Sequence, residues 1–359
     1  MTAGVLSVIL LYLFPKFFEL TPKTNLLLFA ATFFILNYAV RTGIFRAFSS
    51  TALRTALVGN SHVIEAISSY LSSCPHSGFR VSEYIRNTDT GTIAELESDR
   101  FSETDLFVVD GSFLNDESST DIAYRLTAGG KTVMSASDFY ESIFERIPLE
   151  TLNAEWFLKN ISPKKPFYEF LKRAFDLVLS VFLFAALLPL FAIIAVLVKF
   201  SSRGPVFFTQ ERAGFHGIPF TLIKFRTMKA DAEKEGPRFA EKNDSRVTAF
   251  GKILRFTHLD EIPQLLNIAA GDLSFVGPRP ERSVFVESFK KTIPYFEARN
   301  TIKPGLTGWA QINYKYSGNE EETRVKLSYD IFYLKNRSLV LDALILFRTI
   351  KTILFTPGT

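Results

Sequence analysis

The chain has 359 residues, of which 47% are hydrophobic and 37 are phenylalanine, a composition too apolar for an ordinary soluble protein of this length. The length favours about two domains. A net charge of +4 fits anionic partners such as a lipid surface or phosphorylated substrates. The single cysteine, Cys74, excludes an internal disulfide, and the four histidines lack the spacing of a zinc site.

Two apolar stretches open the chain, at residues 3–20 and 24–40. The first lacks a charged leading segment and a small-residue cleavage site, so it is a poor match to a signal peptide. Arginines follow the second stretch, and by the positive-inside rule they place the next segment in the cytoplasm. We therefore predict a transmembrane hairpin over residues 1–47 with both ends inside. Because the first stretch is short, a helix on the membrane surface is the alternative.

Residues 52–147 alternate between strand-like and helical segments, which is typical of a Rossmann-like α/β domain with a parallel sheet. The first turn reads GNSHVIEA and lacks the glycines that let a backbone approach a pyrophosphate. The pattern therefore favours a regulatory or assembly domain without a nucleotide over a working dinucleotide site. Short strands are expected at residues 55–59, 79–85, 105–111 and 131–137, and a helix at 63–71.

Residues 148–171 form a polar and aromatic linker that ends in basic residues, which predict an anchor on anionic lipid. The apolar run from Leu177 to Phe200 is long enough to span a bilayer. Pro189 near its middle is expected to break or kink the helix. Basic residues lie on both flanks of the run, and this symmetry favours a re-entrant helix over residues 172–200, with a kinked spanning helix as the alternative.

Four further segments have recognisable patterns. Residues 205–228 predict a β-hairpin, and the charged residues 229–246 are either a solvated loop or a lid over a charged substrate. Two glycines and a tryptophan in residues 303–313 require a tight, specific turn. Residues 323–355 have helical patterns, and the apolar part from Leu339 to Phe355 is either a core helix or a helix in the membrane interface.

Two adjacent carboxylates, Asp260 and Glu261, lie between Arg255 and Arg279 in sequence. Pro263 indicates that a helix begins within a residue or two of them. The helix dipole favours an ionised acid there, whereas mutual repulsion favours protonation of one of the two. Such a pair suits nucleophilic or acid–base chemistry, and guanidinium groups suit a phosphate-bearing substrate. Taken alone, the stretch also fits a solvated helix start.

Eight motifs occur in order between Lys172 and Leu354. They are KRAFDLVLS (172–180), Pro189 within the apolar run, GPVFFTQERAG (204–214), IKFRTM (223–228), LDEIPQLLNI (259–268), GDLSFVGPRPE (271–281), KPGLTGWAQIN (303–313) and YDIFYLKN (329–336). In these motifs the sequence closely resembles the bacterial sugar transferases, which are polyprenyl-phosphate sugar-phosphate transferases with a monotopic phosphoglycosyl transferase core. The N-terminal α/β domain resembles that of the larger exopolysaccharide members.

The resemblance implies transfer of a sugar-phosphate from a UDP-sugar to undecaprenyl phosphate, with UMP as the second product. It implies an α/β membrane protein in which an N-terminal helical hairpin and a Rossmann-like domain precede a mostly helical α+β catalytic domain over residues 172–359. The catalytic domain, with its re-entrant helix and β-hairpin, is expected on the cytoplasmic face of the bacterial inner membrane. Membrane lipid is an expected partner and nucleic acid is not, while a homo-oligomer stays open.

By the same resemblance, Asp260 is the nucleophile that forms an aspartyl phospho-sugar intermediate, Glu261 assists proton handling, and Mg²⁺ binds at Asp260. Arg255 and Arg279 match positions that bind phosphates. This agrees with physical expectation, because a carboxylate can attack phosphorus only when nearby negative charge is neutralised. Further basic candidates for substrate binding are Lys224, Arg226, Arg212 and Lys315. A structural salt bridge is the alternative role for each cation.

Two departures from the family pattern stand out. After GWAQIN this chain has Tyr314 and Lys315 where many members have Gly-Arg, which keeps the charge but loses the bidentate fork, so donor affinity or sugar preference differs. Larger members have four or more N-terminal membrane helices where this sequence has room for two, so the chain is a natural short form or an incomplete product.

The leading hypothesis is an enzyme that initiates exopolysaccharide or O-antigen repeat units. A non-catalytic membrane scaffold that binds nucleotide-sugar and regulates polysaccharide assembly is the alternative, although the intact acidic pair and Arg279 favour the enzyme. A polytopic transporter would need several more spanning helices than the sequence offers.

Overall fold

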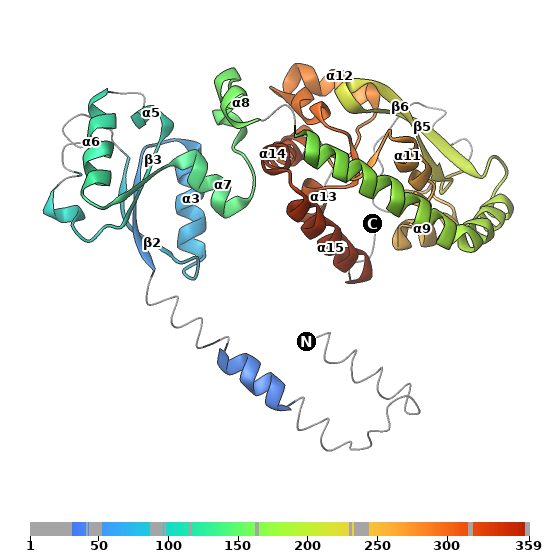
Figure 1. Cartoon of the computed structure of the whole chain (residues 1–359), viewed down its shortest axis with the longest axis horizontal. Helices are drawn as coiled ribbons and strands as arrows, with labels where there is room; N and C mark the ends of the chain where they lie inside the picture. The colour runs from blue at the N-terminus through green and yellow to red at the C-terminus, as the bar shows by residue number, and fades with distance from the viewer. Residues whose placement is uncertain are drawn as a thin grey trace. The chain divides into compact units, whose positions relative to one another are not determined.

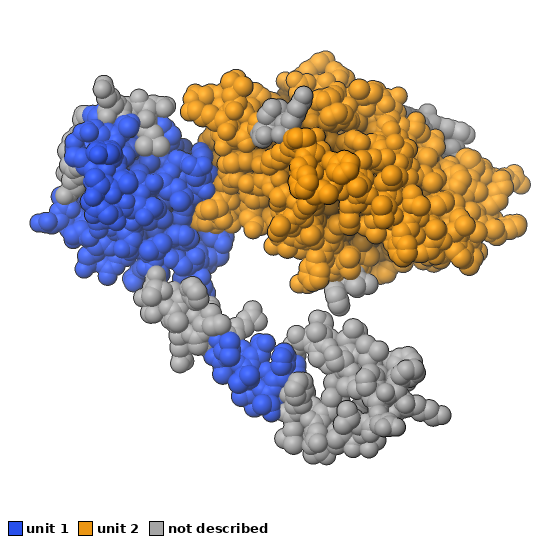
Figure 2. All heavy atoms as spheres, in the orientation of Figure 1, with its two compact units in different colours: residues 1–139 blue, residues 140–359 orange. Residues whose placement is uncertain are grey.

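The chain forms two compact units, residues 1–139 and 140–359, which Figure 2 colours blue and orange. In the region predicted as the hairpin 1–47, the structure describes an exposed apolar helix at Ala31–Val40, and the rest of that prediction lies outside the described residues apart from position 42. The computed structural model describes residues 31–40, 42, 52–86, 96, 98–114, 117–161, 165–229, 232, 244–314 and 319–355.

A four-stranded parallel sheet with the order β2-β1-β3-β4 forms the centre of the first unit, which confirms the predicted parallel sheet. Of the two inner strands, β3 is apolar and buried throughout and β1 is buried from Thr55 to Val58, as expected for strands covered on both faces. Figure 1 shows helices α3 and α6 on either side of the sheet. The elements are β1 (Leu53–Val58), α3 (His62–Ser73), β2 (Phe79–Ile85), η2 (Asp99–Phe101), β3 (Leu106–Val109), α5 (Gly111–Leu114), α6 (Glu117–Ala128), β4 (Thr132–Ser135) and α7 (Ala136–Phe144).

The long helix α9 (Pro166–Ser201) begins before the predicted start at residue 172 and is about 54 Å long. Its length and composition are sufficient to cross a membrane. It continues as a helix through Pro189, which has no N–H to offer the carbonyl of Ala185, and its ribbon bends in the second half (Figure 1). The sequence predicted a break or a kink at Pro189, and the structure has a bend within one continuous helix.

One stripe of α9 packs on the second unit along most of the helix. Ser180, Ile194 and Val198 on this stripe are fully or almost fully buried. The opposite face exposes large apolar side chains from Phe175 to Phe200. A helix with one face packed on protein and the other face apolar and uncovered is a candidate membrane segment.

The predicted hairpin is present as the antiparallel strands β5 (Phe207–Ala213) and β6 (Pro219–Phe225). A second pair, β7 (Ser274–Val276) and β8 (Gly305–Thr307), is parallel. The predicted tight turn is at β8 and the residue after it. Gly305 and Gly308 lie there against the backbone of Gly277. A Cβ added to Gly305 would lie 2.1 Å from the Gly277 nitrogen, and one on Gly308 would lie 2.2 Å from the Gly277 oxygen. Only glycine fits at these two positions.

Helices complete the second unit around a core that includes Ile268, Leu273 and Trp309. Its remaining elements are η3 (Leu149–Thr151), α8 (Ala154–Asn160), η4 (Phe215–Gly217), α10 (Ala249–Thr257), η5 (Leu259–Glu261), α11 (Gln264–Ala270), α12 (Ser283–Thr292), η6 (Phe296–Thr301), α13 (Trp309–Asn313), α14 (Glu320–Asn336) and α15 (Leu339–Phe355).

The helix α15 combines features of both alternatives considered from the sequence. Ile345 is fully buried, as in a core helix, whereas Val340 and Phe347 are 80% and 69% exposed. Asp342, which interrupts its apolar pattern, is buried and accepts a hydrogen bond of 2.8 Å from Lys172 of α9. The helix is therefore fixed to α9 by a polar contact and leaves one apolar face uncovered.

Candidate active site

The acidic pair lies in a short helical segment between α10 and α11. The helix α10 ends at His258, which has a left-handed conformation (φ 57°) that costs a non-glycine residue about 1–2 kcal/mol. The backbone is helical from Leu259 onward, because Ile262 and Pro263 both have helical dihedral angles before α11 begins. The predicted helix start beside the pair is therefore confirmed. The segment also has a fixed helical register, so Asp260 and Glu261 point in different directions.

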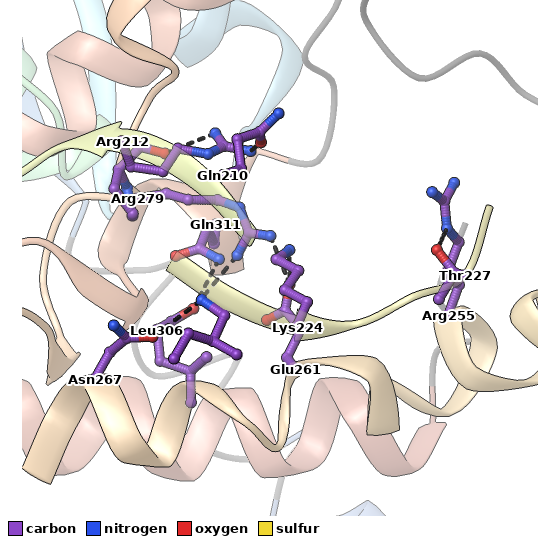
Figure 3. Close-up of polar contacts among 12 residues, drawn as sticks. Gln210, Arg212, Lys224, Thr227, Arg255, Glu261, Asn267, Arg279, Leu306 and Gln311 are labelled. Atoms are coloured by element: carbon purple, nitrogen blue, oxygen red, sulfur yellow. Dashed lines mark hydrogen bonds and ion pairs between the residues drawn. The ribbon is translucent and has the colours of Figure 1, made fainter. Parts of the chain in front are cut away.

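Glu261 binds two cations from two other elements (Figure 3). Its Oε1 atom is 2.9 Å from the Lys224 Nζ of β6 and 2.7 Å from an Nη atom of Arg279 in the loop after β7. Burial by itself would raise the pKa of Glu261, but the charges and hydrogen bonds of Arg279 and Lys224 outweigh burial and hold this pKa well below its usual range. Glu261 is therefore ionised and joins the two predicted cations in one cluster.

Asp260 has a different environment from its neighbour. It is only 9% exposed, and no residue that the structure describes donates a hydrogen bond to its carboxylate. Burial, and next the charge of Glu261, raise the pKa of Asp260, while Lys224, Arg255 and Arg279 oppose that shift. The two acids thus differ in proton affinity, and Asp260 is the one whose oxygen atoms are available to another group.

A buried network behind Arg279 holds its backbone in place. The Arg299 guanidinium donates a hydrogen bond of 2.8 Å to the Arg279 carbonyl and forms an ion pair of 2.9 Å with Asp330 of α14. Burial raises the pKa of Asp330 to about 6, although Arg299 opposes the shift. The sequence reasoning missed this pair. The available signal in the sequence was Asp330, a charged residue inside the largely apolar motif YDIFYLKN, which indicates a buried charge that needs a partner.

Arg212 lies close to Arg279 (Figure 3). Its guanidinium donates to the Pro280 carbonyl at 2.9 Å and to the Gln210 side chain at 2.6 Å. Burial, and next the positive charge of Arg279, lower the pKa of Arg212 to about 10. The structure therefore brings Arg212 to the edge of the cluster, held by its own protein contacts.

Arg255 and Arg226 lie apart from the cluster. Arg255 donates from Nε to the Thr227 hydroxyl at 3.0 Å, and Figure 3 shows it away from Lys224 and Arg279, although its charge still lowers the pKa of Asp260. Arg226 is buried and donates to the Ser202 carbonyl at 2.7 Å, at the C-terminal end of α9. This contact satisfies the carbonyl of a helix end and fits the structural alternative for Arg226.

Lys315 lies outside the described residues, as does nearly all of the predicted lid over residues 229–246. The site predictions for this lysine and for the lid therefore stay predictions.

Two side chains hold α11, and with it the acidic pair, in position. The Asn267 amide accepts from the Ile223 N–H at 3.1 Å and donates to the Thr221 carbonyl at 2.8 Å, which fastens α11 to β6. Arg173 of α9 donates to the carbonyls of Ile268 and Ala269, both at 2.7 Å. These contacts join the carboxylates, the hairpin and the apolar helix into one rigid arrangement.

An acidic pair beside a lysine and an arginine, fastened to a long apolar helix, has groups that suit phosphate chemistry next to a candidate membrane segment. The model of the family described as "Bacterial sugar transferase" matches residues 167–356, so the chain belongs to the bacterial sugar transferase family. The match includes Asp260, Glu261 and the two cations that bind Glu261, Lys224 and Arg279.

Curated relatives agree with this family. A UDP-N-acetylgalactosamine-undecaprenyl-phosphate N-acetylgalactosaminephosphotransferase of Aeromonas hydrophila is 41% identical over 60% of this chain and 50% of that protein. A UDP-glucose:undecaprenyl-phosphate glucose-1-phosphate transferase of Caulobacter vibrioides is 40% identical over 52% of this chain and 71% of that protein. The uncharacterized sugar transferase EpsL of Bacillus subtilis is 40% identical over 52% of this chain and 89% of that protein. The chain thus spans half the length of its Aeromonas relative.

Proposed function

We propose that this protein transfers a sugar-phosphate from a UDP-sugar to undecaprenyl phosphate, giving undecaprenyl diphosphate sugar and UMP. The observation that carries the proposal is the Asp260 carboxylate, which receives no hydrogen bond from the described residues and lies beside the ion-paired cluster of Glu261, Lys224 and Arg279. The names of the Aeromonas and Caulobacter relatives support both substrate classes, but they differ in the sugar. The donor sugar is therefore a question for experiment.

The reaction proceeds in two displacement steps at the same phosphorus atom. An Asp260 oxygen bonds to the sugar-bearing phosphorus, and the bond from that phosphorus to the bridging oxygen breaks, so UMP leaves with that oxygen and the bonding electrons. A phosphate oxygen of undecaprenyl phosphate then attacks the same phosphorus and releases the Asp260 carboxylate. Two easier steps replace one, and a soluble donor and a lipid acceptor use one site in turn.

The cations lower the barrier by neutralising phosphate charge. Arg279 is partly exposed, so part of its guanidinium can reach a ligand, and Lys224 binds the same Oε1 atom of Glu261. For Glu261 itself we propose a positioning role, because its two ion pairs oppose the uptake of a proton. Its assistance in proton handling, implied by the family resemblance, would have to overcome that cost.

Mg²⁺ fits this site if the donor supplies most of its ligands. The described residues contain no group of three or more His, Cys, Asp or Glu side chains that could hold a metal ion. Mg²⁺ is commonly bound by one or two carboxylates together with substrate phosphates, and the Asp260 carboxylate is available for this. When bound, the ion would offset negative charge on the diphosphate.

We further propose that α9 enters the cytoplasmic face of the bacterial inner membrane and returns, without crossing it. Support comes from its two ends, because Lys172 binds Asp342 of α15 and Ser202 binds Arg226 after β6, and both partners belong to the same compact unit. A spanning helix would draw this unit, which is fastened to α9 near both ends, into the hydrocarbon layer together with its charged residues. The exposed apolar face of α9 would then contact lipid.

UMP release tests the proposed reaction. Purified protein with Mg²⁺, undecaprenyl phosphate and a panel of UDP-sugars is expected to release UMP with at least one donor. Asp260→Asn, which keeps the size of the side chain, is expected to abolish release, and substantial residual activity would exclude Asp260 as the nucleophile. Nucleotide-sugar binding without turnover by the unchanged protein would instead favour a non-catalytic scaffold. The donor found would also test the proposed role in initiating exopolysaccharide or O-antigen repeat units.

A further inference from the structure

A second polar side chain in the acidic segment is buried with its amide nitrogen unpaired among the described residues. Gln264, the first residue of α11, is only 3% exposed, and its Nε2 atom is buried without an acceptor among the described residues. Leaving a buried donor unsatisfied costs about 1–3 kcal/mol. Asn267, less than one turn further along, shows the contrast, because its amide makes two hydrogen bonds to β6.

The backbone directs Gln264 toward the nucleophile. The chain forms a 3₁₀ turn at Leu259–Glu261, keeps helical dihedral angles at Ile262 and Pro263 and continues into α11, so Gln264 lies about one turn after Asp260 on a continuous helical path. Helical side chains lean toward the N-terminus, so the Gln264 amide leans toward the turn that carries Asp260. Both residues are buried, whereas Leu266 on another face is 40% exposed.

We propose that the Gln264 amide donates a hydrogen bond to a non-bridging oxygen of the phosphoryl group while that group is transferred to Asp260. This inference rests on the proposed function. A neutral donor at this place supplements the cations Lys224 and Arg279, which bind Glu261. It stabilises the charge that develops on the phosphoryl oxygens and adds no further positive charge to a crowded cationic cluster.

The test measures the first displacement alone. Full-length protein in lipid nanodiscs is mixed with its UDP-sugar in the absence of undecaprenyl phosphate, and the burst of UMP is followed by rapid quench. Gln264→Met keeps the length of the side chain and removes the donor. We expect the burst to slow by about 10²-fold, as when one oxyanion donor is removed, with the half-saturating UDP-sugar concentration changed little. Gln264→Glu should lose at least as much, because it adds a negative charge.

Thermal unfolding separates this role from a structural one. Gln264→Met is expected to leave the Tm unchanged or raise it, because it removes an unsatisfied buried donor. Asn267→Leu, which breaks two hydrogen bonds to β6, is expected to lower the Tm, and Leu266→Met on the exposed face is the control for both measurements.

Three results would overturn the inference, and they can be told apart. A burst in Gln264→Met within threefold of the unchanged protein would show that the amide is not used. A slowed burst together with a loss of Tm like that of Asn267→Leu would assign Gln264 to the fold. No UMP from the unchanged protein with any donor would reject the proposed function, and this inference with it.

Discussion

At the scale of single residues, the environment gives two adjacent carboxylates different properties. Glu261 is held ionised by Lys224 and Arg279, whereas burial and the charge of Glu261 raise the pKa of Asp260. The difference follows from geometry, because neighbouring side chains in a helical segment point in different directions. One carboxylate therefore organises the cations, and the other is available to react.

We predict that Lys224 and Glu261 are energetically coupled. Lys224→Met removes one of the two counter-charges of Glu261, and Glu261→Gln removes the counter-charge of Lys224, so each is expected to destabilise the protein. The double variant should be more stable than the sum of the single effects predicts, with a coupling of about 1–3 kcal/mol. Denaturant unfolding of the four proteins measures this coupling, and additive effects would mean that the ion pair contributes nothing.

We predict that Asp330 makes the free energy of unfolding depend on pH. Its pKa rises from 3.8 to about 6 on folding, mainly through burial, so between these values the folded state binds more protons than the unfolded state. The free energy of unfolding should therefore fall as pH rises from about 4 to about 6, by up to about 3 kcal/mol from this group. The reference is Asp330→Asn, which cannot titrate, and a pH-independent difference between the two proteins would contradict the prediction.

At the scale of elements, α9 is the helix that the others are fastened to. Arg173 binds the end of α11, Lys172 binds α15, and the carbonyl of Ser202 binds Arg226 beside the hairpin. Because α9 is bound near both of its ends, its position fixes the position of the acidic segment. With α9 in the membrane as proposed, these contacts fix the position of the acidic segment relative to the lipid surface.

The topology of α9 can be tested with single cysteines. In a Cys74→Ser background, Lys159→Cys reports the side of α8 and Ile218→Cys the side of the hairpin turn, and both residues are exposed. A re-entrant helix requires that a membrane-impermeant reagent label both from the same, cytoplasmic side of sealed vesicles. Labelling from opposite sides would show that α9 crosses the bilayer.

At the scale of the whole molecule, the family match falls entirely within the second unit. The EpsL relative of Bacillus subtilis is matched over 89% of its own length, so little of that protein lies outside the matched region. The first unit has its own parallel sheet and its own buried core. Each unit therefore contains what a domain needs to fold by itself.

We predict that the second unit is sufficient for the proposed reaction. A chain that begins at Ser135, just before α7, is expected to stay in the membrane fraction and to release UMP within about threefold of the full chain, because the domain retains its core. The same shortened chain with Asp260→Asn is the control for background release. Loss of activity in a folded shortened chain would assign the first unit a part in catalysis.

Much of the local structure follows from short patterns. The hairpin over residues 205–228, the parallel strands and the helix start beside Pro263 depend on residues close in sequence, so they could be predicted. The glycines of the turn after β8 also signalled a close backbone contact. The Arg299–Asp330 pair could not be predicted in this way, because its members are far apart in sequence and meet only through packing.

The sequence by itself determined the family, the alternation of strands and helices, and the acidic pair between arginines, because these are properties of residue type and spacing. The tertiary structure alone decided that Lys224 and Arg279 meet at Glu261, that Arg226 turns instead to the end of α9, and that the Gln264 amide nitrogen finds no acceptor in the described part of the chain. The physical reason is that charge and hydrogen-bond partners depend on distance and burial. Chain folding sets both between residues whose separation in sequence carries no such information.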